Sequence, residues 1–213
     1  MKNSPVIFFG SYLNVLSVFN SLMNVELAVL ESKGNNVEVK NFCQSQNIRY
    51  IEIKSIDEFV ISSKGKQKPI GIVASFGLLF KKQHIDIFGS IYNFHPGCVY
   101  TNRGRHPLPN AIINGLTSMS LSIHQITDEQ IDAGRFIARL ELPIDYYSDY
   151  NSNYTRLLSS LSFLAEMLCK QIIIGIVPSF TLVPDANSYY APLSKELLKK
   201  IIEAESLLEW RLS

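Results

Sequence analysis

The stretch Pro69-Ile70-Gly71-Ile72-Val73-Ala74 is followed directly by Ser75-Phe76-Gly77-Leu78-Leu79-Phe80. An almost wholly apolar run of this length predicts a central strand of a parallel sheet, because such strands are buried on both faces. In open α/β sheets, ligands bind beyond the carboxyl ends of the strands. Residues 75–80 are therefore expected to lie at a binding site.

On both sides of this strand, short apolar runs alternate with helical patterns. Strands are expected at Val6–Phe9, Val25–Leu30, Tyr50–Ile53, Ser90–Phe94, Ser118–Gln125 (with one face buried) and Phe136–Pro143. Helices are expected at Leu13–Met23, Val37–Gln46, Ile56–Ser62, Pro107–Asn114, Tyr154–Ile174 and Ser194–Trp210. This alternation predicts an α/β fold with an open, mostly parallel sheet and flanking helices.

The composition bounds the size and the partners of the protein. The chain has 213 residues, of which 46% are hydrophobic and 18% charged, and its net charge is +1. We expect a catalytic domain at residues 1–183 and a short C-terminal helical appendage at residues 184–213, with no room for a second full domain. A charge so close to zero gives no reason to expect a nucleic-acid partner or an anionic membrane surface.

The three cysteines, Cys43, Cys98 and Cys169, are widely spaced, and neither a secretory signal nor a fully apolar run of transmembrane length is evident. A cytoplasmic location is therefore expected. No close spacing of His, Cys and carboxylate residues recurs, so no metal is expected.

Three polar residue types lie near predicted strands and next to Gly or Pro. They are the amide and imidazole of Asn93-Phe94-His95-Pro96-Gly97 and the carboxylate of Asp132-Ala133-Gly134. An amide N–H and an imidazolium can hold a developing oxyanion, and a carboxylate can orient the imidazole or accept a proton. Taken singly, Asn93 and Asp132 also fit turn residues, and His95 fits a half-buried structural histidine. Together they predict acyl transfer.

The order of these motifs resembles the folate-dependent formyltransferases. The resemblance rests on residues 93–96, the short helical segment that ends at Gly115, Ser122-Ile123-His124 and residues 132–134. It implies a Rossmann-like formyltransferase fold, N10-formyltetrahydrofolate as co-substrate, and Asn93, His95 and Asp132 as catalytic residues. It also implies a folate site formed by Phe76, Gly77, Leu78, Leu79, Phe80, Ile126 and Asp128. His124 is expected to be structural and to support Asp132.

Within that family, the sugar-nucleotide N-formyltransferases fit best. Glycinamide ribonucleotide formyltransferases carry a glycine-rich loop that Gly10-Ser11-Tyr12 lacks, and methionyl-tRNA formyltransferases carry a large C-terminal domain. The resemblance implies a substrate such as dTDP-4-amino-4,6-dideoxyglucose and a role in O-antigen or lipopolysaccharide biosynthesis. Its binding residues would be Tyr100, Arg103, Gly104 and Arg105. The two arginines can clamp a pyrophosphate, or they can form a solvated basic loop.

Several alternatives and departures remain at this point. The chain can instead be a non-catalytic α/β nucleotide-binding domain, or a folate hydrolase of the same lineage. Gly97 and Tyr100 stand where many family members have Ser and Pro, and the loop before Asp132 is slightly longer than usual. A homodimer is expected from the C-terminal aromatic residues Phe180, Tyr189, Tyr190 and Trp210. Base stacking can come from Tyr12, Tyr100, Tyr146, Tyr147 and Tyr150.

Overall fold

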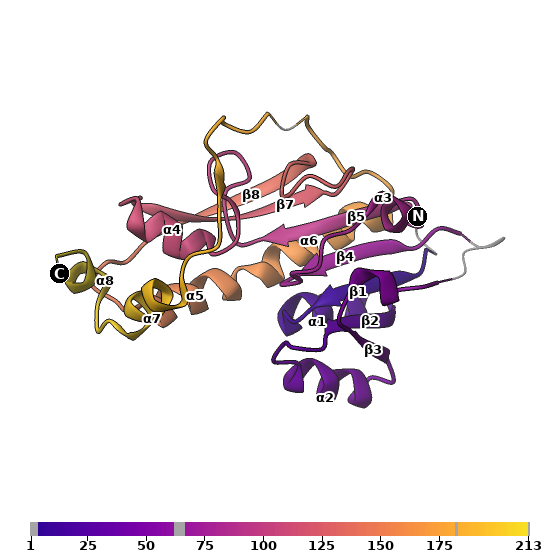
Figure 1. Ribbon diagram of the computed structural model, residues 1–213. Helices are drawn as coiled ribbons and strands as arrows, with labels where there is room; N and C mark the ends of the chain where they lie inside the picture. Colours follow the sequence, from indigo (N-terminus) through magenta and orange to yellow (C-terminus); the bar gives the residue numbers. More distant parts are fainter. Residues whose placement is uncertain (1–3, 62–66, 182, 213) are drawn as a thin grey trace.

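The computed structural model describes residues 4–61, 67–181 and 183–212. Within these residues, a seven-stranded sheet has the strand order β3-β2-β1-β4-β5-β7-β8 (Figure 1). Its strands are β1 (Val6–Gly10), β2 (Val25–Glu31), β3 (Arg49–Ile53), β4 (Ile70–Ala74), β5 (Ser90–His95), β7 (Ser118–Gln125) and β8 (Arg135–Pro143). The strands from β3 to β5 are parallel, whereas β7 and β8 are antiparallel to their neighbours. The expected α/β fold with a mostly parallel sheet is confirmed.

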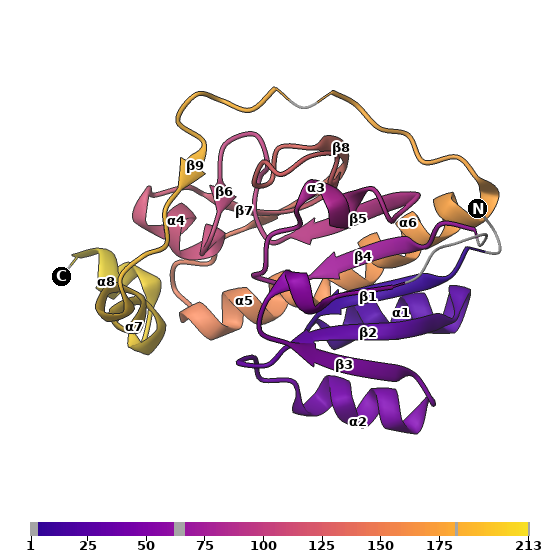
Figure 2. The same cartoon turned by 45° about the vertical axis from the view of Figure 1, so that its right-hand side comes forward.

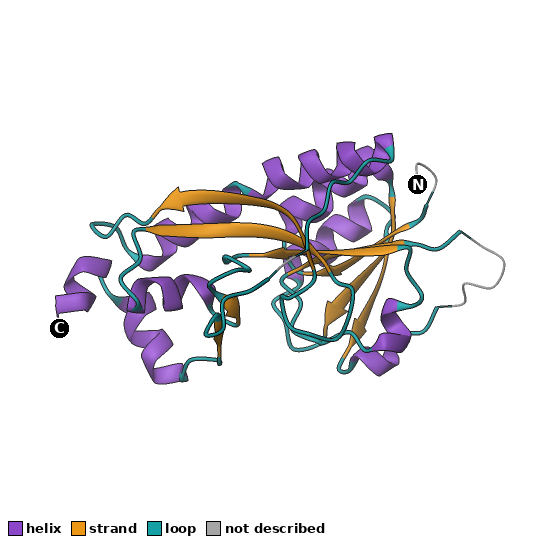
Figure 3. Cartoon of the chain, turned by 90° about the horizontal axis from the view of Figure 1, so that it is seen from above, coloured by secondary structure: helices purple, strands orange, loops and turns teal. Residues whose placement is uncertain are grey.

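The helices connect and cover these strands. They are α1 (Leu13–Met23), α2 (Val37–Ser45), α3 (Lys82–Ile85), α4 (Pro107–Ile113), α5 (Tyr150–Ser159), α6 (Leu161–Ile174), α7 (Lys195–Glu203) and α8 (Leu207–Leu212). Seen from above, the longest helices run along one side of the sheet (Figure 3). There α1 packs against α6.

The core has two parts, one on each face of the sheet. Because side chains alternate along a strand, β1 sends Val6 and Phe8 into the larger cluster and Ile7 and Phe9 into the smaller one. The larger cluster contains the buried faces of α1 and α6. The smaller cluster centres on Phe9, whose ring lies edge-on to four other phenylalanine rings. The apolar run of β1 is thus explained by burial on both faces.

The helix expected at Tyr154–Ile174 is longer and is interrupted. It begins at Tyr150, where the Asp149 side chain accepts a hydrogen bond from the Ser152 N–H, and it divides at Ser160. The Ser160 hydroxyl donates to the carbonyl of Arg156, a bond back to the preceding turn that bends helices. The sequence pattern missed this break because it marks only the apolar face.

The stretch Tyr150–Ile174 is long and apolar enough, by length and composition, to cross a membrane, and 39% of its most apolar window is buried within the protein. Helices of a protein core meet the same criterion, and α6 places Leu161, Leu164 and Leu168 in the larger core cluster. The expectation of no membrane partner stays a prediction.

The C-terminal segment returns to the side of the molecule where the parallel strands have their carboxyl ends. After α6, the chain crosses the sheet, and β9 (Tyr189–Tyr190) pairs in parallel with β6 (Arg103–Gly104) (Figure 2). The helix expected at Ser194–Trp210 is split into α7 and α8, and Ser194 caps α7 as expected. Ile201 and Leu207 are buried in the larger core cluster. The domain boundary at residue 183 stays a prediction, as does the homodimer.

Two further expectations differ in detail. The helix expected at Ile56–Ser62 is a single 3-10 turn at Ile56–Glu58, and Ser62 lies outside the described residues. The strand β7 is buried on both faces. On its polar face, Ser122 donates a hydrogen bond to the Gly97 carbonyl (2.7 Å), and His124 contacts Asp132. Polar residues that alternate with apolar ones had suggested solvent on that face.

Candidate active site

A cavity of about 510 Å³ opens at the carboxyl edge of the sheet. Tyr12 follows β1, Glu31 ends β2, residues 75–80 follow β4, and residues 93–96 end β5, and all of these line the cavity. The strand order reverses between β1 and β4, so the cavity lies at the switch point where open α/β sheets bind ligands. Residues 75–80 thus line a cavity at this edge of the sheet, and their role in binding a ligand stays a prediction.

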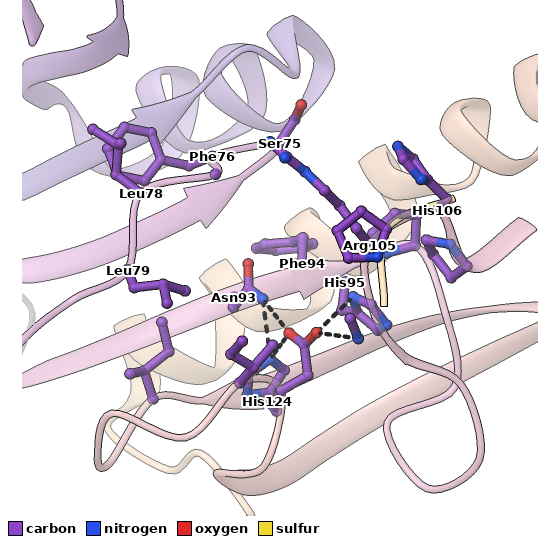
Figure 4. A pocket seen from close by; sticks show the side chains of 18 of the residues that line it. Ser75, Phe76, Leu78, Leu79, Asn93, Phe94, His95, Arg105, His106 and His124 are labelled. Atoms are coloured by element: carbon purple, nitrogen blue, oxygen red, sulfur yellow. Dashed lines mark hydrogen bonds and ion pairs between the residues drawn. The ribbon is translucent and has the colours of Figure 1, made fainter. Parts of the chain in front are cut away.

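The carboxylate of Asp132 links the other two predicted catalytic side chains, Asn93 and His95, which are labelled in Figure 4. Its Oδ1 accepts a hydrogen bond from the Asn93 amide nitrogen (3.1 Å) and lies 3.2 Å from His124 Nε2. Its Oδ2 lies 3.4 Å from His95 Nδ1 and accepts the Gly104 N–H (3.0 Å). The predicted triad thus converges on one carboxylate at the cavity, and His124 supports Asp132 as expected.

Strand register explains why these side chains meet. Asn93 and His95 are two residues apart on β5, so both point to one face of the sheet. His124 on β7 is directly opposite Asn93 in the antiparallel pair. Asp132 then reaches them from a tight loop in which its own φ is +49°. This left-handed conformation is one that Asp tolerates better than most residues.

The surroundings of Asp132 keep it ionised. Burial by itself raises the pKa of this carboxyl, but the charge of His95, the hydrogen bond and charge of His124, and the Gly104 N–H outweigh burial and hold the pKa well below its usual range. A carboxylate with so low a pKa is a weak base. The geometry therefore favours Asp132 as the group that orients His95, more than as a proton acceptor.

Both ring nitrogens of His95 already have acceptors. Nδ1 faces Asp132, and Nε2 lies 2.9 Å from the carbonyl oxygen of Asn102. The two acceptors favour an imidazolium, in which both nitrogens donate. To donate a hydrogen bond to a substrate oxygen, the Nε2–H must be shared with the Asn102 carbonyl or must leave it.

The amide of Asn93 has a fixed orientation. Its nitrogen faces the Asp132 carboxylate, which can only accept, and also lies 3.0 Å from His124 Nε2. The amide oxygen points away from this network (Figure 4). In this arrangement Asn93 presents an acceptor, whereas the sequence analysis had expected an N–H donor. The expected donor role would require the amide to turn away from Asp132.

The predicted folate residues form one apolar wall of the cavity. Phe76 and Phe80 contact the ring of Phe9, with centroids 5.4 and 5.0 Å apart, which ties the loop to the core. Leu79 is 58% exposed although it is apolar. The cavity lining contains all seven predicted residues: Phe76, Gly77, Leu78, Leu79, Phe80, Ile126 and Asp128.

The predicted substrate residues divide into two pairs. Arg105 and Gly104 line the cavity, and the Arg105 side chain extends toward Ser75 (Figure 4). Arg103 and Tyr100 are not among the lining residues. Arg103 is held by the Ser188 hydroxyl (2.9 Å), and the Tyr100 ring packs on Phe136. Arg103 and Gly104 form β6, whereas Arg105 follows this strand in the loop that leads to α4.

Several lining residues were missed or left unassigned by the sequence analysis. They include Glu31, His106, Tyr154, Tyr189 and Pro192, whereas Tyr12 and Tyr150 had been named for base stacking and Ser75 belongs to the expected binding segment. Glu31 follows the rule of strand ends, which could have identified it. Tyr189 and Pro192 reach the cavity only through the pairing of β6 with β9, for which no local signal exists.

In the part of the chain that the structure describes, no group of three or more His, Cys, Asp or Glu side chains is arranged to hold a metal ion. The chemistry proposed below uses the groups of Asn93, His95 and Asp132 alone.

Gly97 packs so closely against His95 that a side chain at position 97 would displace the His95 ring. A Cβ atom at this position would lie 2.5 Å from His95 Nε2 and 2.8 Å from the Asn102 carbonyl. We expect Gly97→Ala to lower the free energy of unfolding by about 1–3 kcal/mol, as overpacking does. Urea unfolding measures this loss, and the matched control is Gly89→Ala, where the nearest atom would be 3.6 Å away. Equal stability of the two variants would contradict this packing.

A sequence model of the formyl transferase family matches residues 24–162. The chain therefore belongs to the formyl transferase family. It is 33% identical over 93 residues to the methionyl-tRNA formyltransferase of Pseudothermotoga lettingae, a match that covers 43% of this chain and 30% of that protein. Matches to four such enzymes span at most 40% of their lengths.

Solved structures show the same fold. The N-formyltransferase of Helicobacter canadensis, in complex with folinic acid and dTDP-3-aminofucose, has a TM-score of 0.72 at 16% identity, over 92% of this chain and 73% of that chain. The phosphoribosylglycinamide formyltransferase of Bacillus halodurans has a TM-score of 0.67 at 20% identity, over 79% of this chain and 95% of that chain. At such identities the likeness establishes the fold alone, and the substrate has to be argued from the site.

Proposed function

We propose that this protein transfers a formyl group from N10-formyltetrahydrofolate to the amine of a nucleotide-linked amino sugar. The observation that carries the proposal is the convergence of Asn93 and His95 on the Asp132 carboxylate at a cavity with an apolar wall. Membership of the formyl transferase family supports the reaction. The complex of the Helicobacter canadensis enzyme with folinic acid and dTDP-3-aminofucose supports the class of substrate.

The residues at the apolar wall fit a folate. A flat ring needs apolar faces and a few polar backbone groups at its edge. Leu78, Leu79 and Ile126 supply the faces, and the loop from Ile126 to Asp132 supplies backbone groups along the same cavity. The exposure of Leu79 is unfavourable in water and is relieved by such a ligand. Bound N10-formyltetrahydrofolate would supply the formyl carbon that the amine attacks.

The three polar side chains then have separate roles. Asp132 remains ionised and holds His95 through Nδ1. Protonated His95 stabilises the negative charge that develops on the formyl oxygen, with Nε2–H shared between that oxygen and the Asn102 carbonyl. Asn93 presents its amide oxygen, which can accept an N–H of the attacking amine and orient its lone pair. The bond between the formyl carbon and N10 would break after the attack, and the proton that the amine loses would pass through water to N10 of the departing tetrahydrofolate. A pre-aimed hydrogen bond to developing charge lowers the activation free energy by about 2.7–4 kcal/mol.

The other part of the cavity suits a nucleotide diphosphate. Arg105 offers a planar fork of donors that matches phosphate oxygens. Tyr150 and Tyr154 stack with centroids 5.6 Å apart, and the Tyr154 hydroxyl lies 2.8 Å from that of Tyr12. Aromatic faces beside an arginine are suited to a base and a pyrophosphate. The sugar amine would then lie between Arg105 and His95, which both line the cavity.

A substrate comparison tests the proposal. The purified protein is given N10-formyltetrahydrofolate with dTDP-4-amino-4,6-dideoxyglucose, with glycinamide ribonucleotide, or with water alone, and tetrahydrofolate release and product mass are measured. We expect formylated sugar only. Arg105→Gln should raise KM for the sugar nucleotide by about 10–100-fold, because a charged hydrogen bond is lost. Arg135→Gln, which changes an arginine that is not among the residues lining the cavity, should leave this KM unchanged.

Turnover of glycinamide ribonucleotide but not of the sugar would overturn the substrate assignment. Release of formate without an acceptor would instead indicate a hydrolase, and no turnover with any acceptor would favour a non-catalytic domain. An unchanged KM in Arg105→Gln would remove Arg105 from the nucleotide site.

A second candidate function is formylation of methionyl-tRNA, because curated relatives with this activity match the sequence. This reaction requires a large basic surface for tRNA. The net charge of +1 favours a small-molecule acceptor instead. Formylation of charged initiator tRNA in the same assay would reverse the choice.

The free, buried state of the three cysteines agrees with a reducing compartment such as the cytoplasm, where we place the reaction.

A further inference from the structure

An acidic side chain, Glu31, lies at the cavity that we assign to a nucleotide diphosphate. Glu31 is the last residue of β2, is half-buried and lines this cavity. The proposed formyl transfer gives it no role. A carboxylate beside a site for phosphates is unfavourable, because like charges repel each other. Its place in the lining is explained by a ligand that also carries a hydrogen-bond donor for this carboxylate.

The Glu31 carboxylate is held in position by the loop that follows β4. Its Oε1 accepts a hydrogen bond from the Gly77 N–H. The Glu31 backbone is fixed as well, because its carbonyl accepts the Gly34 N–H (2.9 Å) and the side-chain amide of Asn36 (2.7 Å). Within the described part of the chain, Glu31 Oε2 has no hydrogen-bond or ion-pair partner. One oxygen of a pre-oriented carboxylate is therefore free to accept from a ligand.

Glu31 and Arg105 border the same small space beside Gly77. A Cβ atom on Gly77 would lie 3.0 Å from Arg105 Nη2 and 3.4 Å from each carboxylate oxygen of Glu31. The Arg105 side chain extends toward Ser75, which also lines the cavity (Figure 4). A guanidinium matches phosphate oxygens, and a carboxylate can only accept. Together the two groups suit a ligand in which a hydroxyl lies close to a phosphate.

The position of Glu31 in the sheet supports a pentose hydroxyl as the donor. In dinucleotide-binding α/β folds, an acidic residue about 20 residues after the first βα turn accepts a hydrogen bond from a ribose hydroxyl. Glu31 ends β2, which pairs with β1, and the strand order reverses between β1 and β4. The acid thus lies one strand away from the switch point, as a pentose lies next to its phosphate.

We propose that Glu31 accepts a hydrogen bond from the 3′-hydroxyl of the nucleotide pentose while Arg105 binds the phosphates. Oε1 stays with the Gly77 N–H, and Oε2 accepts from the hydroxyl. A deoxyribose offers this single hydroxyl, which matches the single free carboxylate oxygen. Glu31 is then a specificity-determining residue that favours nucleotides over phosphates that carry no neighbouring hydroxyl. This assignment rests on the proposed nucleotide-linked substrate.

Binding of two nucleotides that differ only in the 3′-hydroxyl tests this role. Calorimetry measures the Kd of dTDP and of its 3′-deoxy analogue for the wild type and for Glu31→Ala. The wild type should bind dTDP about 10–100-fold more tightly, which is the range for a hydrogen bond to a charged group. In Glu31→Ala this ratio should fall to within about twofold, because the acceptor is gone.

The matched control is Glu26→Ala, which changes an exposed glutamate of the same strand that is not among the lining residues. This variant should keep the wild-type ratio of the two Kd values. Circular dichroism verifies that the variants are folded, and Glu31→Gln replaces Glu31→Ala if the latter is not. The amide oxygen of that variant cannot serve both Gly77 and the hydroxyl, so its ratio should also fall.

The ratio separates recognition of the hydroxyl from a purely structural role of Glu31. Loss of the Gly77 contact alone would weaken both nucleotides equally, so an unchanged ratio in folded Glu31→Ala would overturn the assignment. Equal Kd values for the two nucleotides in the wild type would do the same. In both cases, turnover of the sugar nucleotide would leave the proposed function in place. A wild type that binds neither nucleotide would overturn this assignment and the sugar-nucleotide substrate together.

Discussion

Asp132→Asn is expected to lower kcat by about 10³-fold or more, because an amide cannot accept from all of the donors that surround this position. Two groups approach each carboxylate oxygen: Asn93 and His124 at Oδ1, and His95 and Gly104 at Oδ2. An Asn side chain places an NH₂ against one of these pairs and removes the charge that holds His95. Steady-state kinetics of formyl transfer measures the effect.

The matched control is Asp86→Asn, which removes a carboxylate from an exposed i,i+4 ion pair with Lys82. Such pairs contribute little, so its kcat should stay within about twofold of wild type. A loss below about tenfold in Asp132→Asn would contradict the central role of this carboxylate.

The same variant has a signature in acid. Because the folded-state pKa of Asp132 is depressed, its contribution to stability is present above the unfolded pKa of about 3.9 and is lost as pH falls through the folded value. The wild type should therefore lose stability below about pH 4 more steeply than Asp132→Asn. Urea unfolding at several pH values distinguishes this from a purely catalytic effect.

His95→Gln is expected to lower kcat/KM by about 10²–10⁴-fold, the range for the loss of a positioned acid or base. His95 is 4% exposed and is the only imidazole that links Asp132 to the Asn102 carbonyl among the described residues. Glutamine keeps a hydrogen-bonding side chain of similar length but carries no positive charge. The KM for the folate should change little, because the folate wall is formed by other residues.

A second buried histidine offers a matched control. His84 is 3% exposed on α3 and accepts a hydrogen bond from the Lys81 N–H, and it is not among the residues that line the cavity. His84→Gln should lower thermal stability but leave kcat/KM of the remaining folded enzyme near wild type. Similar kinetic losses in both variants would assign the effect of His95 to folding.

The fold was predictable where burial leaves a periodic trace. The apolar run at residues 69–74 became β4 in the middle of the sheet, because a strand covered on both faces needs no polar positions. Short apolar runs likewise located β1 and β2, and a helical pattern located α1. The break at Ser160 and the division of the last helix were missed, since both depend on backbone bonds that an apolar stripe does not record.

The site was predictable only in part, because a sequence pattern records local alternation and does not record contacts between distant segments. Asn93 and His95 could be placed together because alternation along one strand is a local property. Asp132 was assigned by its motif, yet its four partners come from β5, β6 and β7. The orientation of the Asn93 amide follows from those partners, and it reverses the hydrogen-bonding role that residue type alone had suggested.

The sequence by itself determined the order of strands and helices, the loop after β4 as a binding segment, and the three polar residue types that acyl transfer requires. The tertiary structure alone decided which arginine reaches the cavity, that Tyr189 belongs to its lining, and that Cys98 lies against Arg139. The physical reason is range: propensity and periodicity act over a few residues, whereas hydrogen bonds at the site join segments up to 142 residues apart, as Tyr12 and Tyr154 are.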